Sequence, residues 1–288
     1  MTTVTPVTNL AALDELRFLW HARWLETRVP ATVQSFAWYW RWATSRPRAR
    51  PFACAVHDAG TLVGVVPLAR RIRRIAGSPF RTLAFPDNGG LPSGGAVGPE
   101  PTRTWLAVMD YLSRTARHWD VVDLTGIDPR CDAERIATAA RLRRLPLRRT
   151  ESRPRSNMPR DWPEQVASMW EVACELGTAR IVPLNDASGD IWTARVLQEG
   201  AAWTILSLHP EETAADDGAI VAAWNRTDLL GAIEQAAAAA GMRVVRRKGI
   251  LSARSPAAGD QVRYLIASPA SLRGRLWTWW EQLAHRVA

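Results

Sequence analysis

The chain has 288 residues, of which 47% are apolar and 23% charged, and this composition is that of a folded globular protein rather than a disordered or collagen-like one. No apolar run approaches the ~18 residues that a membrane-spanning helix needs. Three scattered cysteines suggest neither a disulfide framework nor a cysteine metal site, so we expect a reducing, cytoplasmic location. The net charge is +9, and Lys248 is the sole lysine. A GC-rich genome or recognition of an anion would each explain so many arginines.

The first half alternates helices with strands. Apolar residues recur every three to four positions over residues 9–26 and predict a helix with Asn9 as N-cap. Ser35 can cap a second helix, and a turn at residues 58–60 predicts a hairpin within residues 51–71. A loop rich in Gly and Pro then precedes a helix, a strand and a further helix over residues 102–119, 120–127 and 132–145.

The stretch VQSFAWYWRW, residues 33–42, holds three Trp, one Tyr and one Phe. In a helix, one face would carry Phe36, Tyr39 and Trp40, and the opposite face Trp38 and Trp42. The alternation of the aromatic residues also allows a strand. Core packing, lining of a substrate cleft and stacking on nucleic-acid bases are the alternatives. Base stacking is disfavoured because the rings divide between two helix faces instead of lining one groove.

The second half has a similar order of elements. A basic, extended stretch over residues 146–160 separates it from the first. Periodicity and turn residues predict a helix, three strands, a helix, two strands and a terminal helix over residues 163–177, 179–185, 190–198, 201–209, 226–241, 242–249, 261–267 and 271–287. We therefore predict an α/β (α+β) fold of two similar units, residues 1–150 and 151–288, each a mixed twisted sheet flanked by helices.

Several catalytic motifs are missing from the sequence. It contains no P-loop, no G-x-G-x-x-G and no G-x-S-x-G. The five histidines never lie two, three or four positions apart, so there is no local zinc signature and we expect no metal. These absences disfavour P-loop nucleotide hydrolysis, Rossmann redox chemistry and serine-esterase chemistry.

Several segments together resemble one family. They are VQSFAWYWRWATS, PFACAVHDAGTLVGVVPLARR, FRTLAFPDNGG, WDVVDLTGI and CELGTARIVPLNDASGDIWTARVLQEGAAWTILSLHPEE. The chain resembles the GNAT-type acyltransferases of the cellulose-biosynthesis CelD/BcsL family. The family motif F-Q-S-x-x-W-x-x-x-W is matched by Gln34, Ser35, Trp38 and Trp42. In the second half the chain departs from the family, with AAWNRTD in place of a Ser-Pro-Gly and Val262-Arg263 in place of a Tyr-Lys pair.

The resemblance implies N-acyl transfer from the thioester of CoA or an acyl carrier protein to an amine of a small molecule or saccharide, in polysaccharide or secondary metabolism. Such an enzyme works mainly by positioning the thioester and amine, and it holds the cofactor diphosphate at a helix N-terminus. Carried over to this chain, the resemblance makes residues 151–288 the candidate acyl-CoA-binding half, with cofactor contacts from Asn225, Arg226 and Thr227. It implies catalytic roles for Tyr264, His209 and Asp260, and acceptor contacts from Trp38, Trp42 and Asn88.

Other functions stay open. A catalytically degenerate relative would act as a binding or scaffold protein. A phosphate-binding module for nucleic acid is disfavoured, although the charge allows it. The terminal helix over residues 271–287 carries an apolar stripe that can pack over the last strand or make peripheral contact with a membrane surface.

Overall fold

A computed structural model describes residues 1–28, 30–46, 50–75, 77–86, 95–127, 132–151, 162–185, 191–199, 202–210, 227–239, 243–247, 250–254 and 262–278. The chain divides into two compact units. Unit 1 comprises Met1–Asp87, Pro92–Ser152 and Gly259–Ala288, and unit 2 comprises Asn88–Leu91 and Arg153–Ala258. The end of the second segment of unit 1 lies close to the predicted boundary at residue 150. Residues 259–288, which we had assigned to the second half, instead return to unit 1, because a strand within them completes its sheet.

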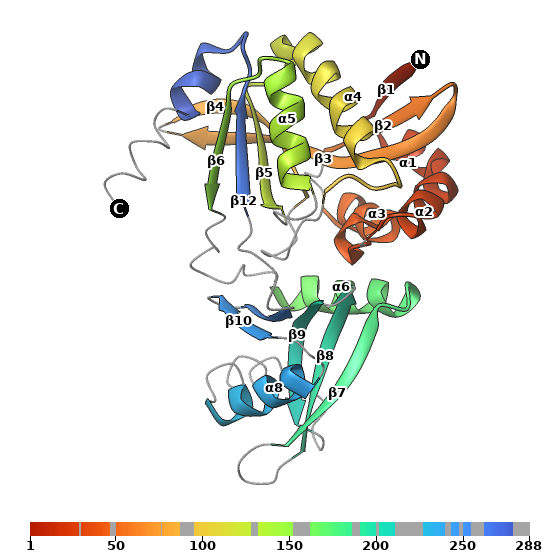
Figure 1. Ribbon diagram of the computed structural model, residues 1–288, viewed down its shortest axis with the longest axis vertical. Coiled ribbons are helices and arrows are strands. Elements are labelled where there is room, and N and C mark those ends of the chain that lie inside the picture. The colour runs from red at the N-terminus through yellow and green to blue at the C-terminus, as the bar shows by residue number, and fades with distance from the viewer. Residues whose placement is uncertain are drawn as a thin grey trace. The chain divides into compact units, whose positions relative to one another are not determined.

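The sheet of unit 1 has seven strands in the order β1-β2-β3-β4-β5-β12-β6. Figure 1 shows the blue strand β12 between the green strands β5 and β6. Every neighbouring pair is antiparallel except β4 and β5, which are parallel. The strands are β1 (Thr2–Val7), β2 (Pro51–Asp58), β3 (Thr61–Ile75), β4 (Ser78–Ala84), β5 (Val121–Ile127), β6 (Leu147–Glu151) and β12 (Val262–Ala267).

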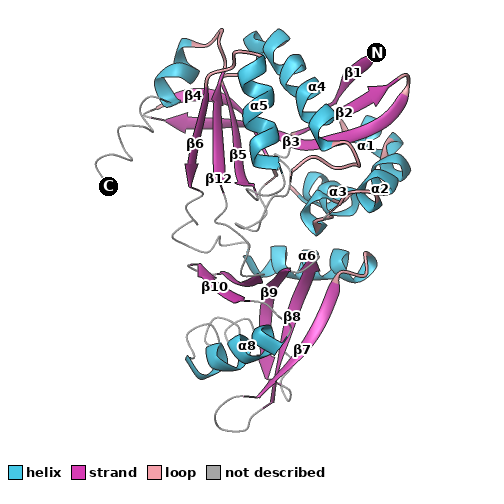
Figure 2. Cartoon of the chain, in the orientation of Figure 1, coloured by secondary structure: helices cyan, strands magenta, loops and turns pink. Residues whose placement is uncertain are grey.

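Helices α4 (Pro101–Arg114) and α5 (Glu134–Leu142) lie side by side on the sheet of unit 1 (Figure 2). Both helices repeat apolar residues every three to four positions, and those residues enter one core with the side chains of one sheet face. The core includes Val66, Leu68, Leu83, Trp105, Met109, Val122, Ile136 and Tyr264, and all of these are buried. The predicted helices and strand at residues 102–145 are therefore confirmed, with small differences at their ends.

The aromatic stretch forms helix α3 (Phe36–Ser45), so the helical interpretation is confirmed. The Ser35 hydroxyl caps it by accepting the backbone N–H of Trp38 at 3.1 Å. Upstream, the predicted helix at residues 9–26 is two helices, α1 (Leu10–Glu15) and α2 (Arg17–Leu25). The Trp20 ring of α2 lies 5.1 Å from the ring of Tyr39, measured between centroids. Core packing is therefore confirmed for Phe36 and Tyr39, which are both buried on one face of α3.

The Tyr39 hydroxyl joins α3 to two strands, since it donates to the Leu68 carbonyl and accepts the Phe52 N–H at 3.0 Å. We expect Tyr39→Phe to destabilise the protein by about 1–3 kcal/mol, because both strand groups lose a buried partner. Tyr264→Phe is the matched control: Tyr264 is also fully buried, but its hydroxyl has no hydrogen-bond partner. Urea denaturation should show no loss of stability for the control, and an equal loss in both variants would contradict the prediction.

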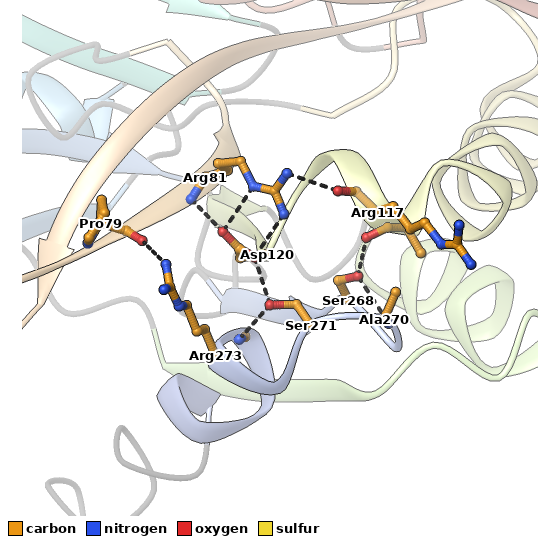
Figure 3. A network of polar contacts seen from close by, with 10 residues as sticks. Pro79, Arg81, Arg117, Asp120, Ser268, Ala270, Ser271 and Arg273 are labelled. Carbon is orange, nitrogen blue, oxygen red and sulfur yellow. Dashed lines mark hydrogen bonds and ion pairs between the residues drawn. The ribbon is translucent and has the colours of Figure 1, made fainter.

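The segment after β12 is fixed to unit 1 by a buried carboxylate (Figure 3). Asp120 accepts the Arg81 N–H at 2.8 Å and the Ser271 hydroxyl at 2.6 Å, and it also pairs with the Arg81 guanidinium. A Cβ atom at Gly274 would lie 2.0 Å from the Asp120 carbonyl oxygen, so only glycine fits at this contact. Trp277 then packs with Phe80 and other sheet residues, whereas Leu272 and Leu276 of the predicted apolar stripe are exposed.

Unit 2 has a five-stranded sheet in the order β10-β11-β9-β8-β7, and all its pairs are antiparallel. Its core contains Trp192, Ala194, Ile205, Leu208 and Ile233. The elements are α6 (Trp162–Glu175), β7 (Ala179–Asn185), β8 (Ile191–Glu199), β9 (Ala202–Pro210), α8 (Thr227–Ala239), β10 (Arg243–Arg247) and β11 (Ile250–Arg254). The protein is thus mixed α/β, with one large mixed sheet and one smaller sheet. The two sheets share an antiparallel meander of three strands but not a common strand order.

Within the described ranges, no helix is both long and apolar enough to cross a membrane.

Candidate functional site

The parallel strands β4 and β5 pair over a short distance. Thr82 pairs with Val121, Leu83 with Val122, and Ala84 with Asp123. There β4 ends, whereas β5 continues to Ile127. In the part of the chain that the structure describes, no strand pairs with residues 124–127 on the β4 side.

A strand edge with unpaired N–H and C=O groups can bind an extended ligand as an added strand. In open α/β sheets, ligands also bind outside the carboxyl ends of parallel strands. The carboxyl ends of β4 and β5 meet both conditions, so we take this place as the candidate site.

A β-bulge distorts β5 at this place. Val262 of β12 pairs with Ile127, and Tyr264 pairs with Leu124, so two residue steps on β12 oppose three on β5. Gly126 within the bulge has a φ of 78°, a left-handed conformation that favours glycine. Bulges bend a strand and re-aim its groups, and they occur often beside active sites.

The connection from β4 to α4 is rich in Gly and Pro, and its far end is tightly held. Val97 exchanges two backbone hydrogen bonds with Val65 of β3, at 2.8 and 3.0 Å. Asp132 accepts the Ala96 N–H at 2.7 Å and the Trp105 indole N–H at 2.8 Å through the same oxygen, Oδ2. Burial raises the pKa of Asp132, against the hydrogen bonds that lower it. The chain therefore enters α4 from a fixed position.

An ion-pair row lies at the last β4–β5 pair. The Arg263 guanidinium donates to both oxygens of Asp123, at 2.8 and 2.7 Å, and an Arg73 nitrogen lies 3.6 Å from the same carboxylate. Asp123 and Arg263 are largely buried, whereas half of the Arg73 side chain is exposed. The row links β3, β5 and β12, and it carries one excess positive charge beside the candidate site.

The predicted site residues fall in different units. Tyr264 lies in β12 of unit 1, fully buried, and burial raises the pKa of its phenol. Trp38 and Trp42 are buried on α3 of the same unit. His209 pairs with Thr193 in β9 of unit 2, and Thr227 begins α8 there as expected. The other four predicted residues, Asn88, Asn225, Arg226 and Asp260, lie outside the described residues.

The strand order of unit 2 separates the two strands that flank α8, the helix at which the resemblance implies cofactor binding. The strands that precede and follow α8 along the chain, β9 and β10, are not neighbours, because β11 lies between them. Among the described strands, the one parallel pair is β4 with β5 in unit 1. Roles for Thr227 and His209 stay predictions.

Sequence reasoning missed the residues that shape the candidate site: Asp123, Gly126, Asp132 and Arg263. One signal was present, because the glycine inside the strand WDVVDLTGI marks a bulge or a close backbone approach.

The chain matches no protein-family model and no curated protein sequence. Its structure is distantly similar to a tandem GNAT protein from the clavulanic acid biosynthesis pathway, solved without acetyl-CoA. The identity is 12%, the TM-score is 0.33, and the match covers 94% of this chain and 100% of the other. It is also distantly similar to a conserved protein of unknown function from Enterococcus faecalis V583, described as a probable N-acyltransferase. There the identity is 9%, the TM-score is 0.31, and 93% of this chain and 73% of the other are covered.

Proposed function

We propose that unit 1 binds the thioester of CoA or of an acyl carrier protein and transfers its acyl group to an amine. One observation supports this proposal. Strand β4 ends at Ala84, whereas its parallel neighbour β5 continues past this point to Ile127 and contains a bulge. The pantetheine arm of such a thioester is extended and contains two amides. It suits an unpaired strand edge, where it would add as a short strand along residues 124–127.

The residues of unit 1 support this chemistry mainly by positioning. A backbone N–H of the bulged end of β5 would stabilise the negative charge that develops on the thioester oxygen when the amine attacks its carbonyl carbon. The neutral amine forms the carbon–nitrogen bond, the carbon–sulfur bond breaks, and the proton that the amine loses passes through solvent to the leaving thiolate. The excess positive charge of the Arg73–Asp123–Arg263 row favours an anionic ligand nearby.

A binding function without catalysis is the second candidate. Acyl transfer to an ammonium group needs an acceptor for its proton. Asp123, the carboxylate at the last β4–β5 pair, is already engaged by Arg263 and Arg73. The acyltransferase therefore needs a proton acceptor other than this carboxylate, whereas a CoA-binding protein does not.

Hydrogen exchange with and without coenzyme A tests the site. We expect slower exchange of the amides in residues 121–127 and no change in residues 227–239. Slower exchange in α8 alone would place the cofactor in unit 2, as the sequence predicted, and no change in either segment would refute CoA binding. Release of free thiol from acetyl-CoA in the presence of an amine panel then separates transfer from binding.

The bulge itself can be tested by substitution. Gly126→Val forces a β-branched residue into a left-handed conformation, so we expect CoA to bind at least about tenfold more weakly, which equals about 1.4 kcal/mol. Gly77→Val is the matched control, since Gly77 has a φ of 81° in the turn between β3 and β4. Calorimetric titration with CoA measures both variants. Equal weakening in the two would mean that backbone strain, and not the place of the bulge, controls affinity.

A further inference from the structure

The helical segment after β12 has apolar side chains on two sides. Residues 272–278 are helical, and Gly274 and Trp277 lie against the sheet side of unit 1. Leu272 and Leu276 lie about one helical turn apart and are 65% and 54% exposed. A single exposed leucine is ordinary, but these two are neighbours on the side of the helix that faces away from Trp277.

Arginines flank this leucine pair. Successive helical residues are about 100° apart, so Arg275 lies on one side of the pair and Arg273 on the other. Both arginines are exposed. A long arginine side chain can lie along apolar surface and keep its charged end in a polar layer. Leucines between two such side chains form the kind of helix face that lies on a lipid surface.

The end of the hairpin formed by β3 and β4 extends this surface. An Arg273 nitrogen lies 3.5 Å from the Pro79 carbonyl oxygen, and Arg74 of β3 pairs with Pro79 (Figure 3 shows the contact of Arg273 with Pro79). The Arg73 guanidinium lies over the Trp277 ring, 5.1 Å from its centroid. Arg74 is exposed, as is half of the Arg73 side chain. The hairpin end and the helical segment are therefore parts of one surface.

The charge of this surface has one sign. Residues 70–82 and 268–278 contain arginine as their only charged residue type. Two carboxylates lie beside these segments, Asp120 and Asp123, but both are buried and each pairs with arginine. The exposed arginines therefore present a positive potential to a ligand outside the protein.

We propose that these side chains form an arginine–leucine surface that binds an anionic lipid surface. It consists of Arg73, Arg74, Leu272, Arg273, Arg275 and Leu276. The guanidinium groups would donate to the phosphates of the lipid headgroups, and the leucines would enter the boundary between headgroups and acyl chains. Nucleic acid would use the arginines alone. This binding does not depend on acyl transfer by unit 1.

Sedimentation of the full chain with lipid vesicles tests the proposal. We expect binding to vesicles of equal parts phosphatidylcholine and phosphatidylserine. Binding to phosphatidylcholine alone should be at least about tenfold weaker, because each arginine near an anionic surface contributes about fivefold in affinity. Added salt should weaken the binding. Equal binding to the two kinds of vesicle, or binding to neither, would overturn the proposal.

The leucine pair can be tested by substitution. Joint replacement Leu272→Ser and Leu276→Ser should weaken vesicle binding at least about tenfold and leave the Tm unchanged, since both side chains are exposed. Phe18→Ser is the matched control: Phe18 is 82% exposed on α2, but Asp14 and Glu15 lie close to it in the chain. Equal weakening in the control, or none in the leucine variant, would overturn the proposal.

Duplex DNA of arbitrary sequence distinguishes the other anionic partner. The joint variant Arg273→Gln and Arg275→Gln should bind vesicles more weakly. If the protein bound DNA as tightly as vesicles, and only the arginine variant lost both, the surface would suit nucleic acid and the proposal would fail.

Hydrogen exchange of the unaltered protein needs no variant. Vesicles that contain phosphatidylserine should slow exchange in residues 272–278 and leave residues 17–25 unchanged. Slower exchange in residues 17–25 alone, or in neither segment, would overturn the assignment of this surface.

Discussion

Replacement of Asp120 by asparagine is expected to destabilise unit 1 by about 3 kcal/mol and to release the segment after β12. The Asp120 residue is 3% exposed, and its carboxylate receives hydrogen bonds from Arg81 and Ser271. An asparagine side chain keeps one oxygen and turns its NH₂ group toward donors, so charged hydrogen bonds are lost at a buried place. Urea denaturation measures the loss of stability, and limited proteolysis reports the release of residues 268–278.

Asp110→Asn is the matched control for this prediction. Asp110 also pairs with two arginines, Arg114 and Arg143, but its side chain is more exposed and the pairs lie at the surface. We expect a loss below about 1 kcal/mol. If both variants lost the same stability, the buried position of Asp120 would not be the cause.

Acid should reproduce the effect of the Asp120 substitution. Burial alone would raise the pKa of Asp120, but the hydrogen bonds from Arg81 and Ser271 outweigh it and hold the pKa below its ordinary value. The stabilisation is therefore present above about pH 4 and is lost as the pH falls through the lowered pKa. Below pH 4 the stability of the native protein should fall toward that of the Asp120→Asn variant, measured by thermal unfolding.

Local signals predicted the helices and turns of the first half well. Asn9 and Ser35 cap their helices through side-chain oxygens, as their positions suggested. The turn at residues 58–60 uses left-handed Ala59 and Gly60 between β2 and β3. In each case the few residues that decide the structure are adjacent in the chain, so a short window contains the necessary information.

The sequence did not predict which distant strands pair with one another. The strand at residues 261–267 was expected, but its pattern does not say which sheet it joins. Its partners are β5 and β6, and Arg263 reaches Asp123 across 140 positions of the chain. Strands β1, β4 and β11 were not predicted at all, and β6 lies in the extended stretch that was expected to separate the two halves. Pairing with neighbouring strands decides these four strands more than their own residues do.

The candidate site also depends on strand partners that are distant in the sequence and not on a local pattern of residues. It consists of backbone groups left unpaired where β4 ends, and of a bulge set by the register of β5 against β12. No residue type encodes such an edge. No catalytic motif marks this place, and the chemistry-bearing residues chosen from the sequence are divided: His209 and Thr227 lie in unit 2, whereas Tyr264 pairs with Leu124 at the bulge in unit 1.

The second large effect is expected at Asp132. In Asp132→Ala the Ala96 N–H and the Trp105 indole N–H both lose their acceptor in a buried place, so we expect a loss of about 3–5 kcal/mol. Asp132→Asn should retain most of the stability, because both donors converge on one oxygen that asparagine can supply. Urea denaturation distinguishes the two variants. If CoA binds as proposed, weaker CoA binding should follow the loss of the Ala96 contact in the alanine variant.

The pH dependence of stability separates charge from hydrogen bonding at this residue. Because burial raises the pKa of Asp132, its contribution to stability is greatest below about pH 4 and is lost as the pH rises through the raised pKa. The Asp132→Asn variant lacks this titration, so between pH 4 and 7 its stability should fall less than that of the native protein. A steeper fall in the variant would mean that the ionised carboxylate is the stabilising form. The Ala96 and Trp105 donors, together with the Arg135 guanidinium 3.3 Å from the other carboxylate oxygen, would then outweigh the penalty of burying its charge.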